Sequence, residues 1–259
     1  MNILKSDRPQ MCFSKASERY EFSSDLQKKI GTELLSWIPG EKRYKFILDV
    51  GIGTGWLTER IGVKFSEAQL FGIDSAAGMI SQAQGKDIDF VLQADAQELP
   101  FKNAFFDLII SNCAYQWVPD LNKAFCSSFR VLKDQGDFYF SCFGKNTFKE
   151  LQMSLKAASK DLTLRDSHWE SVDQKNISRM LAVSGFEDVE VHSEIVRREF
   201  LDIFELIRWL KIIGANQVKR NVFVGRSLLN QANIFYKKNY GDNQSIYASF
   251  EVIKAKARK

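Results

Sequence analysis

The sequence has few of the residues that bind metals or form disulfides. Its 259 residues include four cysteines and two histidines, and no two cysteines form a Cys-x-x-Cys pair. Closely spaced cysteine and histidine residues are the usual ligands of zinc. We therefore expect no metal. We also expect Cys12, Cys113, Cys126 and Cys142 to be reduced and structural, as is usual in the cytoplasm.

Long apolar runs are also missing. The longest, such as residues 108–110, are far shorter than the roughly 20 residues that cross a bilayer. Residues 1–7 contain no apolar signal-peptide segment. We therefore expect a cytoplasmic protein that does not span a membrane.

The chain has no strong excess of charge of one sign. Charged residues make up 26% of it, hydrophobic residues 45%, and the formal net charge is +4. This composition is ordinary for a globular protein, and it does not by itself indicate a nucleic-acid partner. The sequence contains no internal repeat and no low-complexity linker, so its length fits a single domain with a small lid.

One stretch is distinctive, namely residues 46–55 with the sequence Phe-Ile-Leu-Asp-Val-Gly-Ile-Gly-Thr-Gly. It predicts a buried strand, a tight loop and a helix that begins near Trp56. Glycine lets the backbone come close to a ligand, and a helix N-terminus offers unpaired N–H groups. The stretch therefore indicates a nucleotide-type cofactor site.

Strands and helices alternate from residue 46 onward. The expected strands are 46–50, 69–73, 89–93, 106–111 and 137–142, and the expected helices between them are 56–64, 79–84 and 121–132. Further helices are expected at 147–158, 173–184, 201–213 and 226–240, with strands at 189–196 and 247–255. The alternation predicts a parallel sheet with helices on both faces. We expect one domain, with a helical cap (1–40), a sheet core (41–196), a helical lid insertion (197–242) and a last strand (243–259).

The glycine spacing narrows the choice of cofactor. The dinucleotide pattern Gly-x-Gly-x-x-Gly fails because the third glycine, Gly55, comes one residue early, and no Lys-Ser/Thr follows to make a P-loop. What remains is Asp-x-Gly-x-Gly-x-Gly, which resembles the S-adenosylmethionine site of the seven-stranded class I methyltransferases. That resemblance implies a Rossmann-like α/β fold with seven strands.

Polar residues at the following strand ends agree with this cofactor. Asp74 ends the second strand. Its spacing along the chain after the glycine loop is the one expected of an acid that binds ribose hydroxyls. In the class I methyltransferases, the position of Asp95-Ala96 faces the adenine amino group and that of Asn112 lines the methionine end. Asp74 or Asp95 taken singly could simply cap a helix, but their order and spacing together favour the cofactor. The cofactor-binding candidates are Asp49, Gly51, Gly53, Thr54, Gly55, Asp74, Met79, Asp95, Ala96 and Asn112.

Several segments resemble the malonyl-acyl-carrier-protein methyltransferases of early biotin synthesis. Besides the core motifs, they are residues 13–20, 95–101, 106–112, 116–117, 141–151 and 210–216. The discriminating ones are Gln116-Trp117, residues 143–151 and residues 211–216, which we expect on the substrate side. The chain departs from the family at Ile52, where cysteine is usual, and at residues 132–136, where Leu-x-Pro-Gly-Gly is usual.

The resemblance implies methyl transfer from S-adenosylmethionine to the free carboxylate of malonyl carried on an acyl carrier protein. Tyr20 and Lys211 are the candidates that would position this carboxylate, although Tyr20 could be a core aromatic and Lys211 an exposed lid charge. Gln116 and Trp117 would line the substrate pocket, and the histidines lie outside the motifs. Because a carrier protein is acidic, its docking face should be basic, and the candidates are Lys219, Arg220, Arg226, Lys237, Lys238 and the C-terminal basic residues.

Two other functions stay open at this point. The core motifs also fit a methyltransferase that acts on another small acid or on a quinone precursor. They fit equally a protein that binds S-adenosylmethionine without methylating anything, such as an assembly factor or a hydroxylase.

Overall fold

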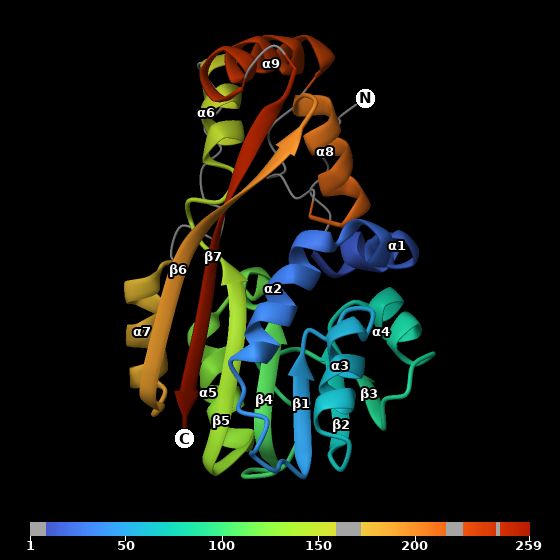
Figure 1. The fold of residues 1–259 in the computed structure, drawn as a ribbon, viewed down its shortest axis with the longest axis vertical. Coiled ribbons are helices and arrows are strands. Elements are labelled where there is room, and N and C mark those ends of the chain that lie inside the picture. Colours follow the sequence, from blue (N-terminus) through green and yellow to red (C-terminus); the bar gives the residue numbers. More distant parts are fainter. Residues whose placement is uncertain (1–8, 159–171, 216–224, 242–243) are drawn as a thin grey trace.

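The computed structural model describes residues 9–158, 172–215, 225–241 and 244–259 (Figure 1). Its helices are α1 (Pro9–Ser23), α2 (Asp25–Ser36), α3 (Trp56–Lys64), α4 (Ala77–Ala83), η1 (Tyr115–Trp117), α5 (Leu121–Val131), α6 (Lys149–Ala158), α7 (Gln174–Val183), α8 (Ile203–Ile212) and α9 (Arg226–Tyr240). Its strands are β1 (Phe46–Val50), β2 (Gln69–Asp74), β3 (Phe90–Gln93), β4 (Phe106–Asn112), β5 (Leu132–Phe143), β6 (Glu187–Phe200) and β7 (Ile246–Arg258). The expected alternation of strands and helices is confirmed.

The strands form one seven-stranded sheet in the order β3-β2-β1-β4-β5-β7-β6. The first five strands are parallel to their neighbours, as expected, but β7 runs antiparallel to both β5 and β6. The expectation of an all-parallel sheet is therefore wrong for the last strand. The reason is the connection: β6 ends near α8 and α9, and β7 starts from the same end and returns between β6 and β5 (Figure 1).

Element boundaries match best in the first half of the chain. β1 and α3 have the expected bounds, whereas the N-terminal helical segment divides at Ser24 into α1 and α2. β5, β6 and β7 are longer than expected, because β6 and β7 run past the edge of the main sheet into a group of helices (Figure 1). In this upper part β6 and β7 still pair with each other, but the elements packed around them are helices, and alternation along the sequence does not reveal such an extension.

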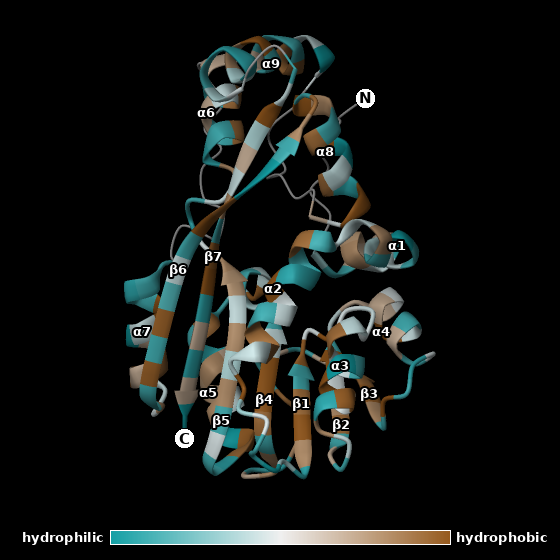
Figure 2. Cartoon of the chain, viewed as in Figure 1, coloured by the Kyte–Doolittle hydropathy of each residue, from teal (hydrophilic) through white to brown (hydrophobic). Residues whose placement is uncertain are grey.

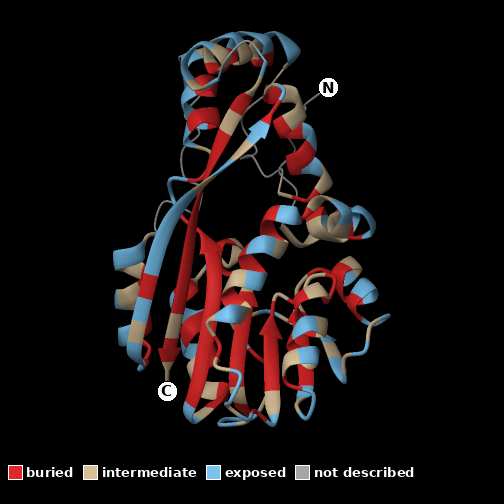
Figure 3. Ribbon diagram, in the orientation of Figure 1, coloured by how far each residue is buried: buried red, intermediate tan, exposed pale blue. Residues whose placement is uncertain are grey.

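The core lies on both faces of the central strands. β1, β4 and β5 are strongly apolar and buried (Figures 2 and 3). One face carries a cluster that includes Phe106, Phe125 and Phe138, and the other carries Leu34 and Ile61, all of them fully buried. The outer strand β6 is largely exposed (Figure 3). The sheet is therefore a rigid platform whose upper edge is free to carry a site.

The helices α6, α8 and α9 pack around the extended ends of β6 and β7, above the sheet (Figure 1). We call this group the upper lid. The expected sheet core (41–196) includes α6, but in the structure α6 packs against α9 and β7. Leu229, Tyr236 and Phe250 are buried in the apolar cluster that holds the group together. α1 lies between α8 of the upper lid and α4, and α2 packs on one face of the sheet.

The segment 143–151 fastens α6 to β7. The buried carboxylate of Glu150 accepts hydrogen bonds from the backbone N–H of Ser249 at 3.0 Å and from its hydroxyl at 2.6 Å. The hydroxyl oxygen of Thr147 accepts from the backbone N–H of Glu251 at 3.1 Å. Buried polar groups need such partners, because an unpaired one costs about 1–3 kcal/mol. Much of this segment therefore builds the upper lid.

The structure also bears on the expectations about cysteines, metal sites and membrane-spanning segments. None of the four cysteines, all of which the structure describes, is in a disulfide, and three of them are buried while Cys126 is exposed. Within the described ranges, no group of acidic, histidine or cysteine side chains is arranged to hold a metal ion. None of the described helices has the length and apolar character needed to cross a membrane.

Replacing Glu150 by alanine should destabilise the fold. The change leaves two buried donors on Ser249 without an acceptor, so we expect a loss of about 2–4 kcal/mol in the free energy of unfolding, measured by urea denaturation. Glu187→Ala is the matched control, because this glutamate is exposed at the start of β6. Equal effects of the two substitutions would contradict the structural role of Glu150.

Candidate active site

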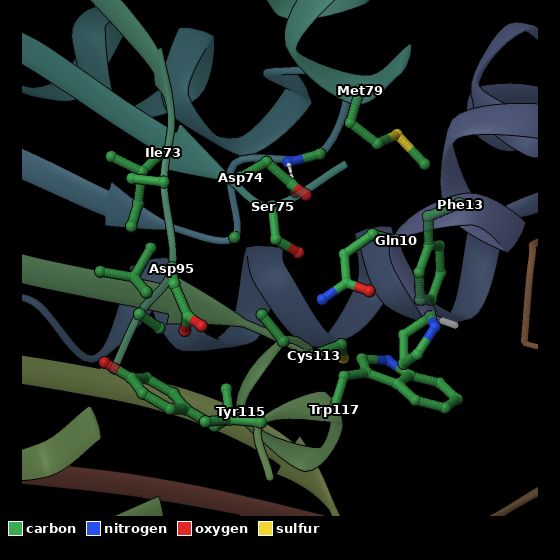
Figure 4. Close-up of a pocket in the computed structure, with 18 of the residues that line it drawn as sticks. Gln10, Phe13, Ile73, Asp74, Ser75, Met79, Asp95, Cys113, Tyr115 and Trp117 are labelled. Carbon is green, nitrogen blue, oxygen red and sulfur yellow. Dashed lines mark hydrogen bonds between the residues drawn. The ribbon is translucent and has the colours of Figure 1, made fainter. Parts of the chain in front are cut away.

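The carboxyl ends of β1, β2, β3 and β4 meet at one edge of the sheet, where open α/β sheets bind their ligands. A pocket lies there, about 880 Å³ when the open solvent at its mouth is included. Its wall brings together nine of the sequence candidates, namely Tyr20, Gly51, Gly53, Asp74, Met79, Asp95, Ala96, Asn112 and Trp117. Figure 4 shows Asp74 and Asp95 on one side of this first pocket, with Gln10 and Phe13 of α1 on the other.

The glycine loop turns its backbone toward the first pocket. Gly51 has φ +78°, and a Cβ there would lie 2.2 Å from the Cβ of Ala114, so a larger residue would collide with the η1 loop. Gly53 has φ +56°, and a Cβ there would meet no atom within 4 Å. Glycine at 53 therefore leaves bare backbone beside open space, which is the surface that a flat ligand needs.

Asp74 holds this loop in place. One carboxylate oxygen accepts the backbone N–H of Gly53 at 3.0 Å, and the other accepts that of Ala76 at 2.8 Å. Burial raises the pKa of Asp74, and these backbone hydrogen bonds partly oppose the shift. A carboxylate has about four acceptor positions, so Asp74 keeps acceptor capacity for a ligand.

Asp95 and Asn112 bound the two ends of the first pocket. Asp95 is exposed, and its carboxylate accepts hydrogen bonds from the backbone and side-chain N–H groups of Gln97 at 2.9–3.1 Å. The Asn112 amide donates to the backbone carbonyl of Gln27 at 2.9 Å and accepts from the Ser141 hydroxyl at 2.7 Å. Asn112 is thus fixed between α2 and β5, whereas Asp95 stands at an open rim.

Three of the loop candidates do not reach the pocket wall. Asp49 is 2% exposed and accepts a hydrogen bond from the Thr58 hydroxyl at 2.7 Å, which ties β1 to α3. Burial raises the pKa of Asp49 to about 7, against the opposing effect of that hydrogen bond. Thr54 is buried, and Gly55 has φ +82° at the N-cap of α3. These residues support the loop from beneath.

The helix α1 forms the outer wall of the first pocket. Of its residues, only Tyr20 was predicted to line the site. The backbone N–H of Gly78 donates to the Ser14 hydroxyl at 3.2 Å, and a Cβ on Gly78 would lie 2.4 Å from the Ser14 carbonyl oxygen. Lys86 forms ion pairs with Glu21 of α1 at 3.3 Å and Glu59 of α3 at 2.7 Å. Only glycine at 78 permits this close approach of α1 to α4.

A second, smaller pocket, about 350 Å³ when the open solvent at its mouth is included, lies between the sheet edge and the upper lid. It shares Phe13, Tyr20, Cys113 and Trp117 with the first pocket, so the two are adjacent. Its remaining lining residues are Gln27, Gln116, Phe143, Phe148, Trp209, Ile213, Ala215 and Phe250. Most of them are apolar. Gln116 is a predicted pocket residue, and Phe143, Phe148, Ile213 and Ala215 lie in the segments expected on the substrate side. The sequence did not point to Gln27, Trp209 or Phe250, because single residues far apart along the chain give no local signal.

Tyr20 stands where the two pockets meet. Its ring lies edge-on to Phe13, which in turn lies edge-on to Trp117 at 5.3 Å between ring centroids. Burial raises the pKa of the Tyr20 phenol above its ordinary value, and the nearby Cys113 and Asp74 raise it further. The hydroxyl is therefore protonated and can donate a hydrogen bond.

Gln116 lines the second pocket as expected, but its amide already has partners. It donates to the Cys113 carbonyl at 2.6 Å and accepts from the backbone N–H of Phe143 at 3.4 Å.

Gly214 shows what the segment 211–216 contributes: its φ is +73°, and a Cβ there would lie 3.0 Å from the Phe13 ring. The end of α8 therefore packs directly against α1.

Lys211 is exposed on α8 and lines neither pocket, so the structure does not bring it to Tyr20. Of the basic candidates, Arg226 and Lys238 are exposed on α9, which also carries Lys237. His192 is exposed and lies edge-on to Trp37. Outside the described residues lie Asn216, Lys219, Arg220 and His168.

Comparison with known proteins identifies the family. A family model described as "Methyltransferase domain" matches residues 48–140. A malonyl-[acyl-carrier protein] O-methyltransferase of Geobacter sulfurreducens is 32% identical, over 93% of this chain and 94% of the relative. One of Methylococcus capsulatus is 30% identical, over 95% and 91% of the two chains.

Solved structures agree on the fold. The YcgJ protein of Bacillus subtilis superposes with a TM-score of 0.60 at 18% identity, over 89% of this chain and 97% of that one. Phosphoethanolamine N-methyltransferase 2 of Haemonchus contortus, solved with S-adenosyl-L-methionine, gives a TM-score of 0.61 at 19% identity, over 95% and 57%. With its class I methyltransferase sheet and relatives matched over nearly their whole length, the chain belongs to the malonyl-[acyl-carrier protein] O-methyltransferase family.

Proposed function

We propose that this protein transfers a methyl group from S-adenosylmethionine to the free carboxylate of malonyl-acyl-carrier protein, which makes the malonyl methyl ester that starts the pimeloyl stage of biotin synthesis. One observation carries the proposal. The likeness to the malonyl-[acyl-carrier protein] O-methyltransferases extends over more than nine-tenths of the chain, and so includes the lid segments that wall the second pocket.

The first pocket suits S-adenosylmethionine, which supplies a methyl group on a positively charged sulfur when it is bound. The bare backbone at Gly51 and Gly53 would face the cofactor, and Asp74 has acceptor positions left for the ribose hydroxyls. Asp95 and Ala96 would face the adenine, with Met79 beside them and Asn112 at the methionine end. Asp49, Thr54 and Gly55 would hold the loop in shape.

The reaction needs no general base, because the malonyl carboxyl group is already ionised at neutral pH. The chain has instead to place this carboxylate and keep water away. We assign placement to Tyr20, whose protonated hydroxyl stands at the junction of the two pockets. A donor held there would fix one carboxylate oxygen and leave the other free to attack.

The second pocket would exclude water. Its walls are mainly aromatic and aliphatic, with Phe148, Trp209 and Phe250 on the side of the upper lid. An anion and a cation that combine into neutral products are favoured by a dry site, since water stabilises the separated charges more than the transition state. α1 and the upper lid would thus contribute to the rate without touching the reacting atoms.

Asp74→Asn should weaken cofactor binding. The substitution removes the negative charge and replaces one of the two carboxylate oxygens, which accept hydrogen bonds from the loop and would accept them from the ribose. We therefore expect the Kd for S-adenosylmethionine, measured by isothermal titration calorimetry, to rise about 10- to 100-fold. Asp134→Asn is the matched control, because that side chain is 92% exposed. An unchanged Kd in Asp74→Asn would show that Asp74 does not contribute to cofactor binding.

Tyr20→Phe should slow methyl transfer while it leaves cofactor binding intact. Loss of one hydrogen bond to a charged group should lower kcat/KM for malonyl-carrier about 10- to 100-fold. Since the pKa of Tyr20 is raised, the wild-type rate should not fall as the pH approaches 10, the ordinary value for tyrosine. Tyr240→Phe on α9 serves as the control. A larger effect on the Kd for the cofactor than on kcat/KM would contradict this role.

Carrier docking should depend on the basic surface of α9. Arg226→Glu reverses an exposed charge at the start of that helix, where an acidic residue favours the helix dipole, so the fold should be retained. We expect KM for malonyl-carrier to rise about 3- to 10-fold, with a smaller effect at high salt. Lys102→Glu, exposed in the loop before β4, is the control. Equal KM values for the two variants would exclude this surface.

The proposed function is tested directly by incubating the purified protein with S-adenosylmethionine and malonyl-carrier, malonyl-coenzyme A or free malonate. Mass spectrometry should detect one added methyl group on the malonyl-carrier. The gene should also restore growth of a biotin-requiring strain that lacks the malonyl methyltransferase. If the protein binds the cofactor but methylates no malonyl thioester, the proposal is wrong.

A further inference from the structure

The second pocket contains a buried amide whose carbonyl oxygen has no partner among the residues that the structure describes. Gln27, on α2, is 7% exposed and lines this pocket. Its side-chain carbonyl oxygen, Oε1, has no hydrogen-bond partner within the described part of the chain. An unsatisfied buried acceptor costs about 1–3 kcal/mol, which a ligand that supplies a donor would offset.

The position of Gln27 is fixed by its surroundings. Leu26 and Ile30, its neighbours on α2, are buried in the apolar cluster of the upper lid. The backbone carbonyl of Gln27 accepts the Asn112 amide at 2.9 Å. Because α2 is held from both sides, the Gln27 side chain stays directed into the pocket rather than toward solvent.

Other polar side chains of the second pocket are already engaged. Gln116 uses both ends of its amide, and the indole N–H of Trp209 donates to the Ser23 carbonyl at 2.9 Å. Tyr20, at the junction with the first pocket, is the donor assigned above to the carboxylate. Gln27 therefore offers an acceptor that no described residue uses, inside a largely apolar chamber.

The chemistry of the substrate identifies what such an acceptor would bind. The malonyl end of a malonyl thioester has only acceptors, namely the carboxylate and the thioester carbonyl. The first N–H group lies beyond the sulfur and two methylene groups, in the amide of the pantetheine arm. We propose that Oε1 of Gln27 accepts this N–H, so that Gln27 recognises the thioester arm rather than the acyl group. The proposal rests on malonyl-carrier being the substrate.

This contact would make Gln27 a specificity-determining residue. The apolar walls suit the sulfur and the methylene groups, and a hydrogen bond to the amide would set how far the arm enters. With that depth fixed, the carboxylate would reach the junction beside Tyr20. A site built around such an acceptor discriminates against analogues that lack the donor, because the buried oxygen is then left unpaired.

The test uses carrier protein loaded with two versions of the malonyl arm. One is native, and in the other the amide nearest the sulfur is replaced by an ester, which exchanges the N–H for an oxygen. The wild-type protein should prefer the native arm by about tenfold in kcat/KM. Gln27→Leu and Gln27→Met should lose that preference, mainly by lowering kcat/KM for the native arm.

Two controls separate the possible outcomes. Gln152→Leu, exposed on α6, should keep the full preference, and the Kd for S-adenosylmethionine should stay within about twofold in each variant that is folded. Equal loss of activity on both arms in the Gln27 variants, or no preference in the wild-type protein, overturns the proposal. Failure of the wild-type protein to methylate the native malonyl-carrier would instead reject the proposed function.

Discussion

The glycine loop after β1 depends on one carboxylate. Asp74 accepts the N–H of Gly53 with one oxygen and that of Ala76 with the other, so it joins the loops that follow the two neighbouring strands. Without this link the left-handed glycines would have many backbone conformations available. With it, the bare backbone faces the first pocket in one arrangement, and the pocket acquires its acidic wall at the same position.

The second pocket depends on a different set of contacts, which hold the upper lid above the sheet. Glu150 binds Ser249 on β7, and Gly214 lets the end of α8 pack against Phe13. These contacts bring aromatic side chains from α1, α8 and β7 into one chamber beside the cofactor pocket. In the reaction that we propose, the lid would act through its shape, since it would supply an apolar space in which an anion can meet a cation.

The segments outside the core that resemble the family were expected to lie on the substrate side. In the structure, some of their residues line the second pocket and others hold the lid together or lie exposed. In residues 143–151, Phe143 and Phe148 line the second pocket, while Thr147 and Glu150 fasten α6 to β7. Lys211 lies exposed and away from both pockets, although its neighbour Ile213 lines one of them. A matching motif identifies a segment of the site, but residues along a helix point in different directions around its axis, so members of one motif can face different surroundings.

The sequence by itself determined the alternating strands and helices, the bounds of β1 and α3, and the acidic and glycine residues at the strand ends, because these follow from local periodicity and loop chemistry. Only the tertiary structure decided the antiparallel return of β7, the close approach of α1 at Gly78, and which side chains enclose the second pocket. Gln27 illustrates the reason. Nothing around it in the sequence marks it, and its buried, unpaired oxygen arises only where α2, the sheet edge and the upper lid meet.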